Sequence, residues 1–372
     1  MNTGTGPAIV NPPAVRILEI GETGLFHWGL PDRTDALYAS YRADLRSARP
    51  YLGLRNLLKA FRDIRAGRYG LVVLHPPLYP GWHWRSFLAA LKFTILKGRP
   101  LDLYGACTSP IYFALLRLLP SCRSIAIDRS DSFGLPRHAF FLLDLVDTFY
   151  KRELPYDHWK VFFGSAHRRL PGRTFRLKKR WLRRVAKLRP IGLGLPIRQA
   201  GQAEVASTTE KASDVFFAGT ISGNSSVRAA VPDLIDKLKA AGISVDMPEG
   251  PLPVEEFMRR CARAWITLSP EGLGWDCYRH MEAALAGSVP LVSAPTIDRY
   301  RPLIIGEQCL CYFPDEDRIV AIVAAALADK ERLKAMALSA QEHVRKHHIE
   351  SAICLDLLVR HCGETASASS TV

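Results

Sequence analysis

Three charged side chains at a spacing of three residues could bind one ligand together: Asp276, Arg279 and Glu282. In a helix, which turns by about 100° per residue, this spacing places all three on one face. The guanidinium of Arg279 offers a planar fork of N–H donors that suits a phosphate group, and the carboxylate of Glu282 can accept hydrogen bonds from sugar or ribose hydroxyls. The same spacing also suits two weak ion pairs on an exposed helix, which is the competing interpretation.

The elements on either side favour the ligand-binding interpretation. Apolar runs at 265–268 and 289–292 predict buried strands, and residues 277–286 between them are rich in helix formers. Asp276 suits the N-cap of this helix, and Gly287 suits the left-handed turn that ends it. The pattern predicts a parallel βαβ unit. In open α/β sheets ligands bind at the carboxyl ends of the strands, where the N–H groups of a helix N-terminus also attract phosphate.

A second loop of small residues precedes another arginine. Residues 214–218 predict a strand, 219–226 form the loop, and a helix that contains Arg228 is expected from Val227 onward. Small residues allow a diphosphate to approach backbone N–H groups. The two loops and their helices therefore predict one site, with Gly219, Thr220, Arg228, Gly272, Gly274, Trp275, Asp276, Arg279 and Glu282.

The composition is that of a folded protein. The chain has 372 residues, 48% of them hydrophobic and 23% charged, which suits two domains. Strands alternate with helical stretches, which predicts an α/β fold with parallel, doubly wound sheets. No apolar run approaches the roughly 20 residues that a membrane span needs, and residues 1–13 do not resemble a secretory signal. The eight cysteines include no Cys-x-x-Cys pair, so we expect reduced thiols, a cytoplasmic protein and no metal site.

Much of the net charge of +14 lies in residues 167–189, which contain almost no acid. Trp181, Leu182, Val185 and Leu188 recur there at nearly helical spacing. A basic amphipathic helix can lie on an anionic membrane surface, which would attach the protein peripherally to the inner membrane face. A solvated helix beside a domain linker is an equal alternative. Nucleic acid is not expected as a partner, because no nucleic-acid-binding module accompanies the segment.

The central motif resembles that of a known class of enzymes. The pattern Trp275-Asp276-x-x-Arg279-x-x-Glu282-Ala283-x-x-x-Gly287-x-x-Pro290-x-Val292 is similar to the nucleotide-sugar-binding motif of GT-B fold glycosyltransferases. The resemblance is greatest to the exostosin-like and spore-maturation (CgeB)-like transferases. The chain is distantly similar to glycosyltransferase family 4, in which two glutamates are separated by seven residues. Here Glu271 and Glu282 are separated by ten.

The resemblance implies two Rossmann-like, doubly wound domains that face a cleft. We expect an acceptor-side domain at 14–195, a nucleotide-sugar-binding domain at 213–338, and a C-terminal helix at 339–361 that crosses back to the first domain. This helix is expected to continue without a break from Glu331 to His361. Residues 1–13 and 363–372 are expected to be disordered.

The implied function is transfer of a sugar from a nucleotide-diphosphate donor to a glycan, lipid-linked or other acceptor, as in polysaccharide biosynthesis. No metal or other cofactor is expected, because helix dipoles and arginines can stabilise the leaving diphosphate. The site residues above would bind the donor. Candidate bases for the acceptor hydroxyl are Glu22, His75 and Asp131, with His27 and Asp128 as further possibilities. The alternative is a non-catalytic protein of the same fold that binds a nucleotide sugar or an anionic polymer.

Overall fold

The computed structural model describes residues 15–21, 24–38, 54–76, 88, 91–92, 95–96, 114–163, 179–207, 210–221, 225–314 and 317–363. Packing divides the chain into two compact units. The first consists of Met1–Asp128, Pro136–Phe149 and Ile353–Val372, and the second of Arg129–Leu135 and Tyr150–Ala352. The domain limits given above stay a prediction. The disorder predicted for 1–13 and 363–372 falls, apart from Gly363, outside the described residues.

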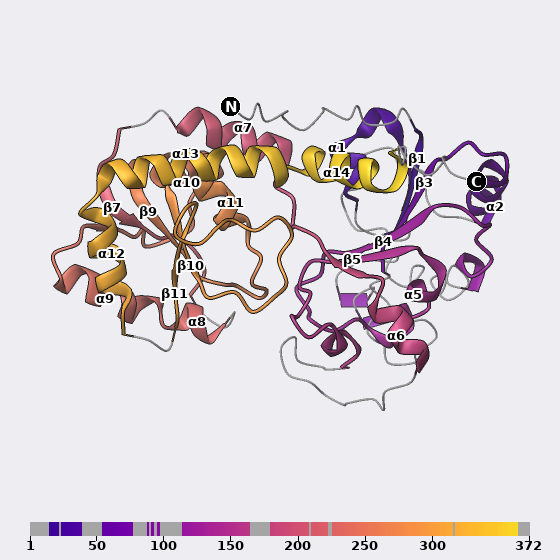
Figure 1. Ribbon diagram of the computed structural model, residues 1–372, viewed down its shortest axis with the longest axis horizontal. Coiled ribbons are helices and arrows are strands. Elements are labelled where there is room, and N and C mark those ends of the chain that lie inside the picture. Colours follow the sequence, from indigo (N-terminus) through magenta and orange to yellow (C-terminus); the bar gives the residue numbers. More distant parts are fainter. Residues whose placement is uncertain are drawn as a thin grey trace, which may run out of the picture. The chain divides into compact units, whose positions relative to one another are not determined.

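A six-stranded sheet has the order β2-β1-β3-β4-β5-β6, and Figure 1 labels its strands β1, β3, β4 and β5. Its strands are β1 Ile17–Gly21, β2 Thr34–Tyr38, β3 Leu71–Leu74, β4 Ser124–Asp128, β5 Thr148–Lys151 and β6 Leu188–Pro190. Strands β1, β3 and β4 are fully buried and pair in parallel, since their apolar sequences suit strands that are covered on both faces. The sequence pattern does not predict β2. Asp35 interrupts its apolar run, and the strand lies at the edge of the sheet.

Several helices accompany this sheet. Among them are α1 Phe26–Gly29, α2 Leu54–Arg65, α5 Leu142–Leu145, α6 Lys179–Val185 and α14 Glu350–Cys362. In the described part of the chain, 3₁₀ turns cover Pro31–Arg33, Arg137–Ala139 and His158–Phe162.

A five-stranded sheet has the order β11-β10-β9-β7-β8, and all of its pairs are parallel. Its strands are β7 Ser213–Phe216, β8 Val245–Asp246, β9 Ala264–Ser269, β10 Val289–Ser293 and β11 Leu310–Tyr312. Its helices are α7 Ile197–Ala206, α8 Ser226–Ala229, α9 Val231–Ala240, α10 Val254–Arg263, α11 Tyr278–Leu285, α12 Ile319–Leu327 and α13 Lys330–His347. The predicted βαβ unit is confirmed as β9, α11 and β10, and the α/β class with two parallel sheets is confirmed with it.

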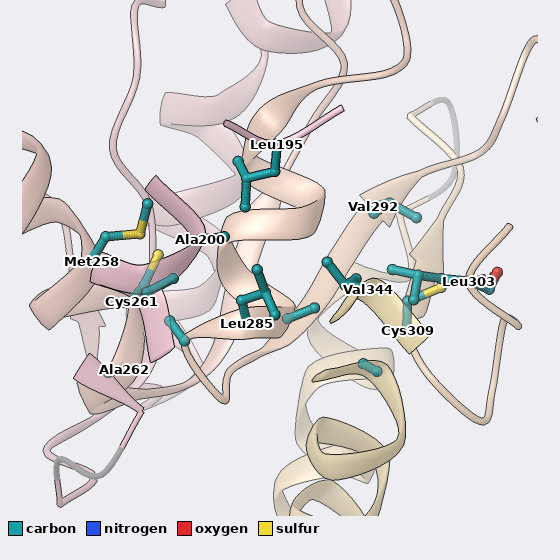
Figure 2. Packing of buried hydrophobic residues seen from close by; sticks show 14 of the residues in the cluster. Leu195, Ala200, Met258, Cys261, Ala262, Leu285, Val292, Leu303, Cys309 and Val344 are labelled. Carbon is teal, nitrogen blue, oxygen red and sulfur yellow. Dashed lines mark hydrogen bonds between the residues drawn. The ribbon is translucent and has the colours of Figure 1, made fainter. Parts of the chain in front are cut away.

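Two apolar clusters cover the two faces of this sheet, because neighbouring residues of a strand point to opposite faces. In β10, Leu291 packs with α9 and α12, whereas Val292 packs with α7, α10 and α11. Figure 2 shows the second of these clusters, in which Leu285 of α11 lies among residues from α7, α10 and α13. Helix α11 is therefore held by its apolar side, which leaves its other side available for a site.

The C-terminal helix returns to the first unit, as predicted, but it does not continue unbroken from Glu331. Helix α13 ends at His347 and α14 begins at Glu350. The break arises because Leu195 donates to the carbonyl of His348 at 2.8 Å and accepts from the N–H of Glu350 at 3.0 Å. Helix α14 then lies beside α1, where the thiol of Cys354 donates to the carbonyl of Leu25 at 3.5 Å (Figure 1). Within the described residues, no helix has the length and hydropathy to cross a bilayer.

We predict that Gly287→Ala destabilises the protein by about 1–2 kcal/mol, because φ at this position is 77° and an L side chain is strained there. Urea unfolding followed by circular dichroism measures the change. Gly201→Ala is the matched control: this glycine lies inside α7 with open space around it, so the substitution should stabilise the helix by about 0.5–1 kcal/mol. Equal destabilisation by both variants would contradict the assignment of a strained turn to Gly287.

Candidate functional site

A cavity of about 850 Å³ opens at the carboxyl end of β7, between the start of α11 and the loop after β8. Five of the residues predicted to bind the donor line it: Gly219, Thr220, Arg228, Arg279 and Glu282. The other residues that line the cavity are Gln199, residues 217, 218, 221 and 247–252, Val254, Phe257, and residues 277 and 278. All of these residues belong to the second unit.

Two guanidinium groups are packed against glycines in the cavity wall. The guanidinium of Arg279 lies 5.2 Å from the centre of the Phe217 ring, and a Cβ atom at Gly219 would overlap it. A Cβ atom at Gly272 would lie 2.8 Å from Nη2 of Arg228. The glycines at 219 and 272, which the sequence assigns to close approach of a phosphate, thus also make room for the two arginines.

Neither arginine forms an ion pair with a carboxylate among the residues that the structure describes, although the charge of Glu282 acts on Arg279. Arg228 is only 8% exposed, and its Nε has no hydrogen-bond partner there, nor do Nε and Nη1 of Arg279. Burial, and next the charge of Arg228, lower the pKa of Arg279. Buried charges without partners are costly, so binding of an anion beside the two guanidiniums would be favourable.

Glu282 lies on the same wall, one helical turn after Arg279, and is 7% exposed. The side-chain amide of Gln199 donates a hydrogen bond to its Oε1. Burial raises the pKa of Glu282 to about 7, although the charge of Arg279 and the bond from Gln199 oppose the shift. Sequence reasoning missed Gln199, which lies between the limits of the two predicted domains. No local motif distinguishes it, because α7 reaches the site only through the tertiary fold.

Asp276 does not cap α11, which corrects the prediction. Cys277 occupies the N-cap position without a side-chain hydrogen bond, and the carboxylate of Asp276 instead accepts from the backbone N–H of Leu193 at 2.8 Å. Asp276 and Trp275 line a different, much smaller cavity together with Arg152 and Arg299. The structure therefore places these two predicted donor-binding residues apart from the large cavity.

The backbone N–H groups of the glycine loop bind a carboxylate of the chain itself. The N–H groups of Trp275 and Asp276 donate to Glu153 at 2.9 and 3.0 Å, and Glu153 is completely buried. Burial raises the pKa of Glu153 to about 7, against the opposing charge of Arg152. Sequence reasoning did not assign a role to Glu153, because more than 120 positions separate it from its partners.

Two of the described candidate bases, His75 and Asp131, are engaged. His75 is 1% exposed, with Nε2 at 2.9 Å from Oε1 of Glu19 and Nδ1 at 3.1 Å from the carbonyl of Ile127. Asp131 forms an ion pair with Arg152. Either residue would have to leave these partners to accept a proton. Glu22 lies outside the described residues.

Glu19, in strand β1, places a buried carboxylate at the start of helix α1. It accepts from the N–H groups of Leu25, Phe26 and His27 at 2.7, 3.1 and 2.8 Å. Burial alone would raise the pKa of Glu19, but the hydrogen bond and charge of His75, together with these N–H groups, lower it below the usual range.

The basic segment is described only from Lys179 onward. The Trp181 ring packs 4.8 Å from that of Phe162, and Leu188 is buried, whereas Leu182 is 53% exposed. Part of the apolar side of this segment therefore packs within the protein. Contact with a membrane through 167–189 stays a prediction. Within the described ranges, no group of His, Cys, Asp and Glu has a geometry that could hold a metal ion.

Comparisons with known proteins show similarity of overall fold. No family model matches the chain, and no curated protein does. Sucrose-phosphate synthase from Thermosynechococcus elongatus aligns with a TM-score of 0.49 and 11% identity over 93% of this chain and 98% of that one. HepE of Anabaena in complex with UDP-glucose aligns at 0.44 and 12%, over 93% and 99%. A glycosyltransferase from Rickettsia africae aligns at 0.49 and 7%, over 95% and 100%.

We predict that the unliganded protein becomes less stable between about pH 4.5 and 7 because Glu282 must ionise while buried. The raised pKa means that the stability due to this group is complete below 4.5 and is lost as the pH rises through 7. The full difference is about 3 kcal/mol. Urea unfolding at several pH values should show that Glu282→Gln gains stability relative to the wild type as the pH rises. The exposed Glu307→Gln serves as the control, and the same trend in both variants would contradict the prediction.

Proposed function

We propose that the protein is a GT-B type glycosyltransferase that transfers a sugar from a nucleotide-diphosphate donor. The observation that carries this proposal is the cavity of the second unit, in which Arg228 and Arg279 lie beside Glu282 with guanidinium N–H groups that have no hydrogen-bond partner among the described residues. The cavity volume is in the range of small-molecule sites. A diphosphate would neutralise the two arginines, and Glu282 would accept hydrogen bonds from ribose or sugar hydroxyls.

The chemistry follows from the charges. As the bond between the sugar and the diphosphate breaks, negative charge builds on the departing oxygen. Two preorganised guanidiniums in a partly dry site stabilise that charge without needing to move. No metal ion is required in this scheme. Because the arginines stabilise the charge that develops as the bond breaks, they favour transfer of the sugar and not only binding of the donor. A glycan, a lipid-linked sugar or another hydroxyl compound would be the acceptor.

A non-catalytic binding protein is the second candidate, and one observation favours it. Two of the described candidate bases are held by partners, His75 by Glu19 and Asp131 by Arg152. A transferase that inverts the sugar needs a base for the acceptor hydroxyl. A protein that only binds a nucleotide sugar would need the cavity but no base.

A thermal-shift screen against nucleoside diphosphates and nucleotide sugars, with and without Mg²⁺, tests the donor site. Uridine nucleotides belong in the screen, since UDP and UDP-glucose are bound in the HepE structures. A ligand at about 100 times its dissociation constant stabilises the protein by roughly 2.7 kcal/mol. We predict that one nucleoside diphosphate raises the melting temperature by several degrees, and that Arg228→Gln and Arg279→Gln each lose most of the shift.

The exposed Arg259→Gln, which loses only a surface ion pair with Glu256, should keep the full shift. Without ligand, Arg279→Gln should melt at a higher temperature than the wild type, because it removes a buried charge next to another of the same sign. Undiminished ligand shifts in both site variants would remove the arginines from the donor site.

Slow hydrolysis of the bound donor separates the two candidate functions. We predict that the protein releases free sugar from its nucleotide sugar over hours, because a site that stabilises the departing diphosphate also allows water to attack. Chromatography of the nucleotide products measures the release, and Glu282→Gln should abolish it. Tight binding of the intact nucleotide sugar without any release would favour the binding protein.

A further inference from the structure

We propose that Glu153 is a positioning residue of the donor site, which fixes the loop 271–276 and, through it, the guanidinium of Arg228. This inference rests on the proposed function, because it concerns how that donor site is held. Glu153 does not line the large cavity, so its effect on the ligand must pass through the loop.

The carboxylate of Glu153 occupies the anion-binding position of the glycine loop. Its two oxygens accept from consecutive backbone N–H groups, those of Trp275 and Asp276. Consecutive N–H groups of this kind are a common way for loops to bind anions. A Cβ atom at Gly274 would lie 2.5 Å from the carboxyl carbon of Glu153, so the loop is packed directly on the carboxylate. A phosphate group cannot share this position.

The other end of the loop is fixed to Arg228. The hydroxyl of Ser225 donates to the carbonyl of Glu271 at 3.2 Å and accepts from the backbone N–H of Arg228 at 3.0 Å. Gly272, whose N–H donates to the carbonyl of Gly274 at 2.9 Å, packs against the guanidinium of Arg228. The loop 271–276 thus connects Glu153 to Arg228. Its last two N–H groups bind the carboxylate of Glu153, and its first two residues contact Ser225 and Arg228.

The charges around Glu153 keep its carboxylate in place. Arg152 lies with its Nε at 3.5 Å from Oε1 of Glu153, and its Nη2 also pairs with Asp131. The carboxylate of Asp276 is the neighbouring group of like charge. Glu153 therefore has two backbone N–H groups and one guanidinium as partners, and replacing its carboxylate by an amide presents an N–H₂ group to one of these donors.

The test is a double-mutant cycle on nucleotide affinity, measured by calorimetry with the nucleoside diphosphate that the thermal-shift screen identifies. We expect Glu153→Gln to weaken binding about tenfold while the circular dichroism spectrum stays unchanged. In the Arg228→Gln background, Glu153→Gln should have almost no further effect, because the loop then has no guanidinium to position. If Glu153 only stabilised the fold, Glu153→Gln would weaken nucleotide binding by the same factor in the wild-type and the Arg228→Gln backgrounds.

Glu350→Gln is the matched control, since Glu350 is also a buried glutamate of the second unit, 3.6 Å from Arg129. It should leave nucleotide affinity unchanged. If Glu153→Gln does not fold, Gly274→Ala displaces the same carboxylate from the loop side and should show the same dependence on Arg228. Unchanged affinity in the Glu153 variant, or additive effects with Arg228→Gln, would overturn the inference and leave the donor site intact. Absence of nucleotide binding by the wild type would instead remove the proposed function itself.

Discussion

The repulsion between two guanidiniums that line one cavity is the constraint on which the candidate site of the second unit depends. Arg228 and Arg279 repel each other, and within the described residues neither forms an ion pair, although the charge of Glu282 acts on Arg279. Such an arrangement persists only if the surrounding structure fixes both side chains independently. Helix α11 carries Arg279 and is anchored by its apolar side in the core shown in Figure 2. Arg228 is fixed by the short helix α8 and by the loop that packs on it.

Both units use a buried carboxylate to satisfy backbone N–H groups, at the start of helix α1 in the first unit and in the glycine loop in the second. In the first unit Glu19 accepts from three consecutive backbone N–H groups, and in the second Glu153 accepts from two. Each glutamate is buried, and each has one cationic or imidazole partner, His75 or Arg152. The pKa values of the two carboxylates are shifted in opposite directions. The N–H groups and His75 lower the pKa of Glu19, whereas burial dominates at Glu153 and raises its pKa. An internal carboxylate makes a loop rigid but removes its N–H groups from ligand binding.

Local sequence pattern was enough to predict the central elements of the site but not helix α7. The βαβ unit of β9, α11 and β10 has strong periodicity and clear end signals, including the left-handed Gly287. Five of the predicted donor-binding residues line one cavity, because loops at the carboxyl ends of neighbouring parallel strands meet at one edge of a sheet. Whether these residues bind the donor stays a prediction.

Contacts between residues far apart in the sequence determine the features that the local sequence pattern did not predict. Gln199 and Glu153 come from segments with no motif of their own, and only the fold brings them to Glu282 and to the glycine loop. Asp276 had the right residue type for a helix cap, yet the backbone N–H of Leu193 binds its carboxylate instead. Strand β2 was missed because Asp35 disturbs its apolar pattern, although an edge strand tolerates such a residue.

The return of the last helix has a consequence for synthesis of the chain. Cys354 and Cys362 donate to the carbonyls of Leu25 and Gly70, so the first unit contains residues from both ends of the chain. A ribosome makes the chain from the N-terminus, and domains generally fold as units during synthesis. The second unit, nearly all of it continuous in sequence, ends at Ala352 and is therefore translated before most of helix α14. The first unit, although its translation begins earlier, cannot be completed until the residues after Ala352 have been made, so its β1 and β3 region waits for them.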